Sequence, residues 1–249
     1  MKISDLLIGC GVKNTDLVVL HSRLTEKTAD LEALLEELSA FLADGVLIMP
    51  TGANPDTAVS NGIFDPEHSV SGEGALSELF RQKEGVVRSQ HPVGSLAALG
   101  KGSPMLMEGH ERCISAFSAA SPWWRIFQAG GKCVFMGCGL ECSGLVAAIE
   151  EWTGAALLSK RFRPRRLRLK NGRNRCLKIK VHTGNHFLNY PKAEKYLEEA
   201  HVLVRVAFDC CDVIVMDIAG CAEWLLRRLR RKPRFFAARR KRENLKNEW

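Results

Sequence analysis

The sequence predicts an α/β protein whose sheet contains at least one parallel pair of strands. Two observations carry this prediction. A strand–helix–strand pattern covers residues 17–49, and apolar strand segments alternate with helical segments along the rest of the chain. The 249 residues, 46% of them hydrophobic and 26% charged, have the composition of a globular protein. A chain of this length buries enough surface to fold without a disulfide or a metal staple.

The first unit is a strand, a helix and a second strand. Residues 17–20 are uniformly apolar and predict a buried strand, and residues 46–49 predict another, stopped by Pro50. The helix between them begins after Asp30, which can cap it, and ends at Gly45. Its apolar side chains recur at the helical period: Leu31, Leu34, Leu35 and Leu38. Two strands joined through a helix in this way favour a parallel pair.

A long loop and a series of further elements follow. Residues 51–74 are rich in Gly, Asn, Asp, Pro and Ser, and a loop of this length in a compact domain is usually functional or disordered. Ser121 is expected to cap a helix that begins at Pro122, and Gly130-Gly131 to close it. Helices are expected over residues 76–82, 122–128, 143–152 and 191–199, with a long final helix that ends near Pro233. Strands are expected over residues 86–88, 132–136 and 202–208.

Asn171-Gly172 predicts a tight hairpin turn between residues 166–170 and residues 175–181. Apolar and basic residues alternate in both strands, so one face of the hairpin is apolar and the other is basic. We expect the apolar face to pack inward: Leu167, Leu169, Leu177, Ile179 and Val181. We expect the basic face to be exposed to solvent: Arg166, Arg168, Lys170, Lys178 and Lys180.

The net charge of +8 is unevenly distributed. Residues 161–180 hold ten Lys and Arg and no acid, and residues 227–249 hold eleven against two Glu, so the rest of the chain is acidic. The basic segments either keep a hairpin and a tail in solution or attract a polyanion, such as nucleic acid or an anionic membrane surface. We expect no nucleic-acid partner, because the chain carries no nucleic-acid-binding motif. The acidic body favours a cationic ligand.

Composition also limits the compartment and the number of domains. No apolar run reaches the ~18 residues of a transmembrane helix, and the N-terminus lacks a secretory signal. Nine cysteines, an odd number, argue against a disulfide framework and for the cytoplasm. We expect no metal, since the Cys and His spacings match no zinc site. Nothing indicates a linker before residue 227, so we expect one domain over residues 1–236 and a basic tail over residues 237–249, and the sequence leaves a homodimer open.

A set of motifs occurs in a fixed order along the chain. Residues 20–24 read L-H-S-R-L, residues 64–66 read F-D-P, and residues 88–100 read R-S-Q-H-P-V-G-S-L-A-A-L-G. A Ser121-Pro122 pair and a Gly-rich strand end before Glu150 come after them. Together these motifs resemble the aminoglycoside 3-N-acetyltransferase (antibiotic N-acetyltransferase) family, closely over residues 15–155 and loosely over residues 160–236.

The resemblance implies a single three-layer α/β/α domain around a mixed, partly parallel sheet. It also implies transfer of the acetyl group of acetyl-CoA to a small-molecule acceptor, an amine of an aminoglycoside or of another amino sugar. The pantetheine arm of acetyl-CoA is then expected beside two segments, at Ser22, Arg23, Leu24, Ser89, His91, Pro92, Val93 and Ser95. Turn backbone and serine hydroxyls offer partners for its amides, and Arg23, Arg88 or the basic hairpin offers cations for its phosphates.

Plain structural roles are the alternatives for several of these residues. The serines can be ordinary turn caps, and His91 is either a ligand contact or a structural hydrogen-bonding residue. The acids of the long loop either line the site of a cationic acceptor or only balance a solvated loop: Asp56, Asp65, Glu67 and Glu73.

One departure from the family pattern affects the expected chemistry. The family segment reads T-x-x-H-x-x-E, and its His removes a proton from the attacking amine. In this chain Gly144 stands for the Thr, Ala147 for the His, and Glu150 matches the Glu. We take His182 and Glu150 as the candidate catalytic residues.

Three explanations of this departure stay open. Another base acts, with His182 or His186 as candidates. The acceptor differs, for example a sugar amine or hydroxyl in polysaccharide or secondary-metabolite synthesis. Or the protein is a non-catalytic relative that still binds CoA.

Overall fold

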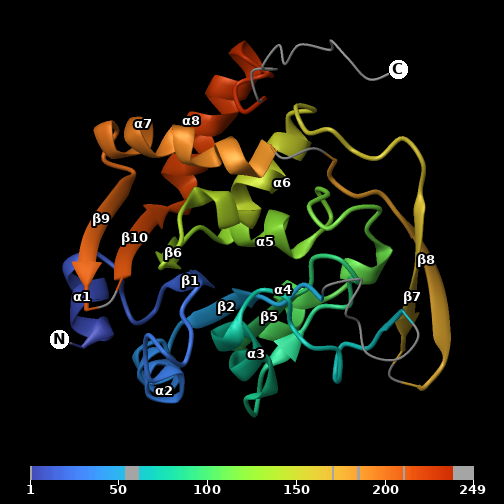
Figure 1. The fold of residues 1–249 in the computed structure, drawn as a ribbon, viewed down its shortest axis with the longest axis horizontal. Coiled ribbons are helices and arrows are strands. Elements are labelled where there is room, and N and C mark those ends of the chain that lie inside the picture. Colours follow the sequence, from blue (N-terminus) through green and yellow to red (C-terminus); the bar gives the residue numbers. More distant parts are fainter. Residues whose placement is uncertain (1, 54–61, 170, 184–185, 210, 238–249) are drawn as a thin grey trace, which may run out of the picture.

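The computed structural model describes residues 2–53, 62–169, 171–183, 186–209 and 211–237. Helices cover both faces of a seven-stranded sheet whose strand order is β4-β5-β2-β1-β6-β10-β9 (Figure 1). The strands are β1 (Leu17–Ser22), β2 (Val46–Pro50), β3 (Ile63–Phe64), β4 (Val87–Arg88), β5 (Leu96–Gly100), β6 (Lys132–Met136), β7 (Arg163–Arg168), β8 (Asn174–Ile179), β9 (Leu203–Phe208) and β10 (Cys211–Asp217). The α-helices are α1 (Ile3–Gly9), α2 (Leu31–Phe41), α3 (Ala75–Gln82), α4 (Ser103–Met107), α5 (Pro122–Ala129), α6 (Gly144–Trp152), α7 (Glu194–Glu199) and α8 (Ile218–Arg231). Three 3₁₀ helices complete the described chain: η1 (His110–Arg112), η2 (Leu140–Cys142) and η3 (His186–Ala193).

The centre of the sheet is parallel and its edges are antiparallel. β1 pairs in parallel with both β2 and β6, which confirms the predicted strand–helix–strand unit. β5 runs antiparallel to β2, and β10 runs antiparallel to β6 and β9. The sheet is therefore mixed and partly parallel, as expected.

Alternate side chains of the central strands feed two separate apolar cores. On one face Val19, Ile48 and Phe135 pack with residues of α5, α6 and α8. On the other face Val18 and Leu47 pack with residues of α1, α2 and α3. Because strand side chains alternate between the faces of a sheet, this division gives the three-layer α/β/α arrangement.

A smaller sheet, of order β3-β7-β8, contains the predicted basic hairpin. Leu167, Leu177 and Ile179 are buried in its apolar cluster, while Arg166, Arg168 and Lys178 are exposed, which confirms the predicted register. Lys180, which was expected on the exposed face, is half-buried. β3 joins this sheet by pairing in parallel with β7. The long loop therefore contains a short strand that the sequence did not predict.

Several local predictions were wrong. α5 begins at Pro122 as predicted, but Ser121 makes no capping hydrogen bond through its side chain. Pro191 does not open a helix, because it lies inside η3, and the α-helical turns begin only at Glu194. α2 ends at Phe41, before Gly45. By contrast, Asp30 caps α2 as predicted, since its carboxylate accepts from the Ala33 N–H at 3.1 Å.

Some predictions concern residues outside the described ranges. Asp56 of the long loop, Lys170 of the hairpin and the tail from residue 238 onward lie there. Among the described residues, no helix is both long enough and apolar enough to cross a membrane.

Candidate active site

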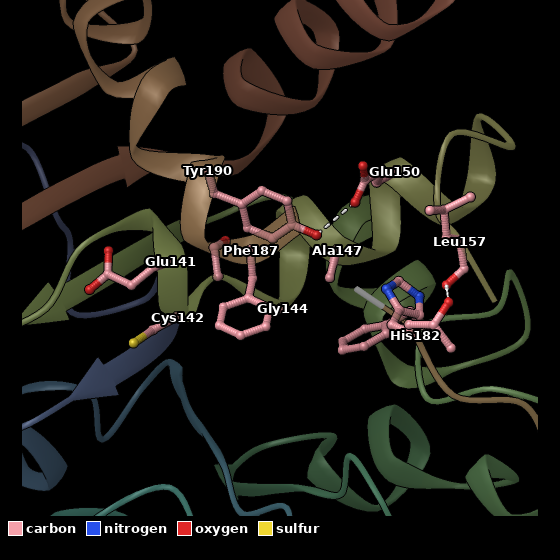
Figure 2. A pocket seen from close by; sticks show the side chains of 12 residues that line it. Glu141, Cys142, Gly144, Ala147, Glu150, Leu157, His182, Phe187 and Tyr190 are labelled. Atoms are coloured by element: carbon pink, nitrogen blue, oxygen red, sulfur yellow. Dashed lines mark hydrogen bonds between the residues drawn. The ribbon is translucent and has the colours of Figure 1, made fainter. Parts of the chain in front are cut away.

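A cavity of about 210 Å³ opens beside the first turns of α6. Its walls come from α6 itself, from η2 and η3, and from the segment that follows the hairpin (Figure 2). The lining residues are Phe117, Glu141, Cys142, Ser143, Gly144, Ala147, Glu150, Leu157, His182, Thr183, Phe187 and Tyr190. The two candidate catalytic residues, His182 and Glu150, thus line one cavity although they are 32 positions apart.

α6 presents one face to this cavity. Ser143 caps the helix, as its hydroxyl accepts from the Val146 N–H at 3.3 Å. Gly144, Ala147 and Glu150 follow at three-residue spacing, which places them on the same side of a helix. Gly144 packs against Trp123 so closely that a Cβ atom there would lie 2.1 Å from the Trp123 Cζ2. The indole therefore occupies the space that a side chain at position 144 would need.

Glu150 is held by a tyrosine from η3. Its side chain is buried, and its Oε2 accepts a hydrogen bond from the Tyr190 hydroxyl at 2.8 Å (Figure 2). Burial, together with the Glu150 carboxylate, raises the pKa of Tyr190, so this phenol stays protonated and acts as a donor. The pair places one carboxylate oriented by one hydroxyl in the wall of the cavity.

His182 is oriented by the residue after Glu150. Its Nε2 lies 2.8 Å from the Glu151 Oε2, and the other oxygen of Glu151 accepts from the Ser115 hydroxyl. A carboxylate only accepts, so the Nε2 atom of His182 carries the proton, and in the neutral ring the lone pair resides on Nδ1. The ring of Phe117 meets the imidazole edge-on at a centroid distance of 4.9 Å.

Glu151 is a site residue that the sequence analysis missed. Consecutive residues of a helix point about 100° apart, and of these two glutamates Glu150 lines the cavity while Glu151 does not. Glu151 instead meets His182 because the chain after the hairpin returns to α6, where His182 bridges to Leu158. No local sequence signal marks this contact.

The first predicted cofactor segment lies at the end of β1. Ser22 and Leu24 are buried, and the Ser22 hydroxyl accepts from the Leu24 N–H at 3.1 Å. Arg23 points outward, with 62% of its side chain exposed, and its ion pair with Glu141 is long, at 3.9 Å. Because Glu141 also lines the cavity, the Arg23 guanidinium lies next to the mouth of the candidate site.

The second predicted segment is largely buried. Ser89, His91 and Ser95 are all almost fully inaccessible. The Ser89 hydroxyl lies 2.9 Å from the His110 Nδ1 and accepts from the Leu96 N–H, while the Ser95 hydroxyl donates to the Thr51 carbonyl. Pro92 is buried and Val93 half-buried. The three polar side chains therefore hold the turn together from inside.

Arg88 is likewise occupied by the protein itself. Its guanidinium donates to the carbonyls of Thr51, Pro66 and Ser69, and its Nε donates to the Ser95 hydroxyl. Burial lowers its pKa to about 10, which still leaves it charged at neutral pH. Arg88 thus anchors the described part of the long loop, and of the cations considered for a phosphate only Arg23 and the hairpin remain exposed.

Three buried histidines surround these segments. The ring of His91 stacks on that of His110 at 4.6 Å, and the ring of His21 stacks on that of Phe135 at 4.8 Å. Burial lowers the pKa of His21 to about 3 and that of His91 to about 4, and it also lowers the pKa of His110. All three imidazoles are therefore neutral at neutral pH.

The acids of the long loop differ in their surroundings. Asp65 is half-buried and lies 3.7 Å from Arg168 of the hairpin, while Glu67 and Glu73 are exposed. None of these three lines the cavity beside α6. Within the described ranges, no group of three or more His, Cys, Asp or Glu side chains is arranged to hold a metal ion.

Comparisons with known proteins agree with this architecture. The chain matches the family model of aminoglycoside 3-N-acetyltransferase over residues 20–230. It is 34% identical over 177 residues to aminoglycoside N(3)-acetyltransferase VII of Streptomyces paromomycinus, a match that covers 63% of this chain and 60% of that protein. The matched region spans 55–64% of the length of the first curated relatives.

Solved structures show the same fold. The apoenzyme of the aminoglycoside acetyltransferase AAC(3)-IVa superposes with a TM-score of 0.79 at 21% identity, covering 96% of this chain and 90% of that one. AAC-IIIb in a binary complex with CoASH superposes with a TM-score of 0.78 at 16% identity, covering 92% and 95%. The predicted α/β class with a mixed sheet is confirmed.

Proposed function

Because the chain belongs to the aminoglycoside 3-N-acetyltransferase family, we propose that it transfers an acetyl group from acetyl-CoA to an amino group of an aminoglycoside or of another amino sugar. The observation that carries this proposal is the His182–Glu151 pair at the cavity beside α6. Members of this family are expected to need a base, and an imidazole that a carboxylate orients is a suitable one.

We assign the binding of acetyl-CoA, the acetyl donor, to the two motif segments at residues 22–24 and 89–95. Acetyl-CoA supplies the acetyl group as a thioester. The exposed Arg23 is available to a phosphate because its ion pair with Glu141 is long, and a guanidinium binds phosphate through forked hydrogen bonds. Ser89, His91 and Ser95 bond inward, so we assign them the task of holding the turn whose backbone and Val93 meet the pantetheine arm.

His182 is proposed as the base. An amine is protonated at neutral pH and must lose a proton before its nitrogen can attack the carbonyl carbon of a thioester. The Nδ1 lone pair of His182 accepts that proton, and Glu151 stabilises the imidazolium that results. When the C–S bond breaks, His182 returns that proton to the leaving sulfur, and the newly acetylated nitrogen loses its excess proton to solvent.

The carboxylates of the cavity favour a cationic acceptor. Glu141 and Glu150 both line it, and Tyr190 fixes the direction of the Glu150 side chain. Opposite charges attract an ammonium group and fix its orientation. Phe117, Leu157 and Phe187 form apolar walls, so polar groups of the acceptor can find hydrogen-bond partners in only part of the cavity.

The departure at positions 144 and 147 is part of the proposal. Ala147 carries no imidazole, so His182 from the opposite wall replaces the expected base. Gly144 packs against Trp123, and the indole fills the space that the side chain of the family's Thr would need. We therefore expect a working site in which the base enters from another element.

Thiol release from acetyl-CoA in the presence of aminoglycosides and amino sugars tests this function. Glu151→Gln should reduce kcat about tenfold or more, because a hydrogen bond to a charged group contributes about 1.5–3 kcal/mol, and the KM for acetyl-CoA should not change. Glu199→Gln, at an exposed glutamate of α7, is the matched control and should have no effect. Thiol release with hydroxylated sugars but with no amine would contradict the proposal, and so would an unchanged kcat in Glu151→Gln.

A further inference from the structure

A second cavity, of about 650 Å³, lies where η3, α7 and the end of α8 meet. Its lining residues are Lys192, Tyr196, Arg228, Lys232, Pro233, Arg234 and Phe235. Four of these seven are cations and none is an acid. The proposed acetyl transfer uses none of them.

Arg228 is the most unusual member of this group. Its guanidinium carbon lies 4.9 Å from the ring centre of Trp224, 5.1 Å from that of Tyr196 and 5.3 Å from that of Phe235. Aromatic faces attract the cation but accept none of its N–H groups in the geometry of a normal hydrogen bond. Within the described residues, the contacts of the Arg228 guanidinium are with these rings and not with a carboxylate.

The neighbouring arginine shows the contrast. Arg227 pairs with Glu223 one turn earlier on α8, at 2.5 Å, which is an ordinary arrangement for an exposed helix face. Arg228, about 100° further around the helix, lines the cavity beside the aromatic rings. Arg230 and Arg231, also in the last turn of α8, already place positive charge at the negative end of the helix dipole.

The cavity wall is held in place before any ligand arrives. Lys192 donates to the Phe235 carbonyl at 3.1 Å, and its ammonium also lies 4.8 Å from the Phe235 ring. Asn189 donates to the carbonyl of Phe236 at 2.9 Å, and both phenylalanines are buried. The turn that carries Arg234 is therefore anchored at two points, so a ligand need not order it.

Four cations line this cavity and no acid does, so their charges repel one another, and a multiply charged anion relieves that repulsion. The macrodipole of α8 explains cations in its own last turn, but it does not call for Lys192 from η3 or Arg234 beyond the helix. The Arg228 guanidinium presents planar forked donors, which suit a phosphoryl group better than a monovalent carboxylate.

We propose that this cavity binds the phosphoryl groups of a phosphorylated small molecule, at a site separate from that of acetyl transfer. Arg228 and Arg234 donate to the phosphate oxygens, and Lys192 and Lys232 add charge. The proposal does not depend on the acetyltransferase activity, because it concerns residues outside the cavity beside α6.

Calorimetry of the full chain with pyrophosphate and with ADP tests this site. Pyrophosphate probes the charge alone and ADP adds a base that can contact the aromatic rings, so the two titrations separate an inorganic from a nucleotide ligand. Binding should weaken with rising salt. Arg228→Gln and Arg234→Gln should each weaken binding about tenfold or more, while Arg227→Gln should not change it. Arg234 is exposed, so its variant keeps the test valid if Arg228→Gln lowers the melting temperature.

Three results would overturn the proposal. The first is the absence of binding of both ligands at millimolar concentration. The second is equal binding in all three variants. The third is a loss of CoA affinity in Arg228→Gln and Arg234→Gln, because the cavity would then belong to the acetyl donor. A failure of thiol release with intact pyrophosphate binding would refute only the proposed function.

Discussion

Acidification from pH 7 to pH 5 should destabilise this protein through its buried histidines. His21 and His91 have folded-state pKa values of about 3 and about 4, against 6.5 for an accessible histidine, and burial is the main cause for both. As the pH falls below 6.5 the unfolded chain binds protons that the folded chain refuses. Stability is therefore complete above about pH 6.5 and is lost as the pH falls toward the folded-state values.

The magnitude follows from the size of this window. One pKa unit corresponds to 1.36 kcal/mol, and pH 5 lies about 1.5 units below the unfolded value, so each imidazole costs about 2 kcal/mol there. His21 and His91 together should remove about 4 kcal/mol, and His110 acts in the same direction. The carboxylates with lowered pKa values, Asp65 and Glu78, lose their contribution only at more acidic pH.

Urea unfolding at the two pH values measures this loss. His21→Phe keeps a ring against Phe135 and Trp123 but cannot bind a proton, so its loss between pH 7 and pH 5 should be about 2 kcal/mol smaller. His201→Asn, at an exposed histidine, is the control and should leave the loss unchanged. Equal unfolding free energies at both pH values, or the same loss in His21→Phe as in the parent, would refute the reasoning.

Three further predictions follow from the site. CoA at about 100 times its Kd should raise the unfolding free energy by about 2.7 kcal/mol and the Tm by several degrees, and no shift at millimolar CoA would contradict CoA binding. Gly144→Ala should lower the free energy of unfolding in urea by about 1–3 kcal/mol, because its Cβ would lie 2.1 Å from Trp123. Gly9→Ala, with nothing within 4 Å of its Cβ, should not lower it, and equal stability of the two variants would show that the indole moves aside. Ala147→His should raise kcat in thiol release by returning an imidazole to the cavity wall, and a fall in kcat with unchanged CoA affinity would mean that the new ring blocks the acceptor.

Features set by neighbouring residues could be predicted from the sequence. The β1–α2–β2 unit, the Asp30 cap of α2 and the inward face of the hairpin all depend on short-range periodicity and turn chemistry. The sequence did not predict β5 and β10, although both are apolar, because their strand character depends on pairing with β2 and β6. Pro191 was misjudged since a proline at the first position of an α-helix and one inside a 3₁₀ turn look alike in sequence.

The site divides in the same way. Glu150 and His182 could be named from the motif and from the order of the chain, and they do line one cavity. The hydrogen bond from His182 to Glu151 could not be predicted, because it spans 31 positions and depends on how the hairpin returns to α6. The burial of Ser89, His91 and Ser95 could not be predicted either, because Ser89 and Ser95 form hydrogen bonds with His110 and Thr51, which lie in other segments of the chain.

The measurement that tests the central claim most directly is thiol release from acetyl-CoA by His182→Ala, with an aminoglycoside or amino sugar that the unmodified protein acetylates. Loss of a general base costs about 10²–10⁴-fold in rate, so kcat should fall by 100-fold or more, CoA affinity should persist, and added imidazole should restore part of the rate. Equal turnover in His182→Ala and in the unmodified protein would contradict the account, because the proton of the acceptor would then leave by another route.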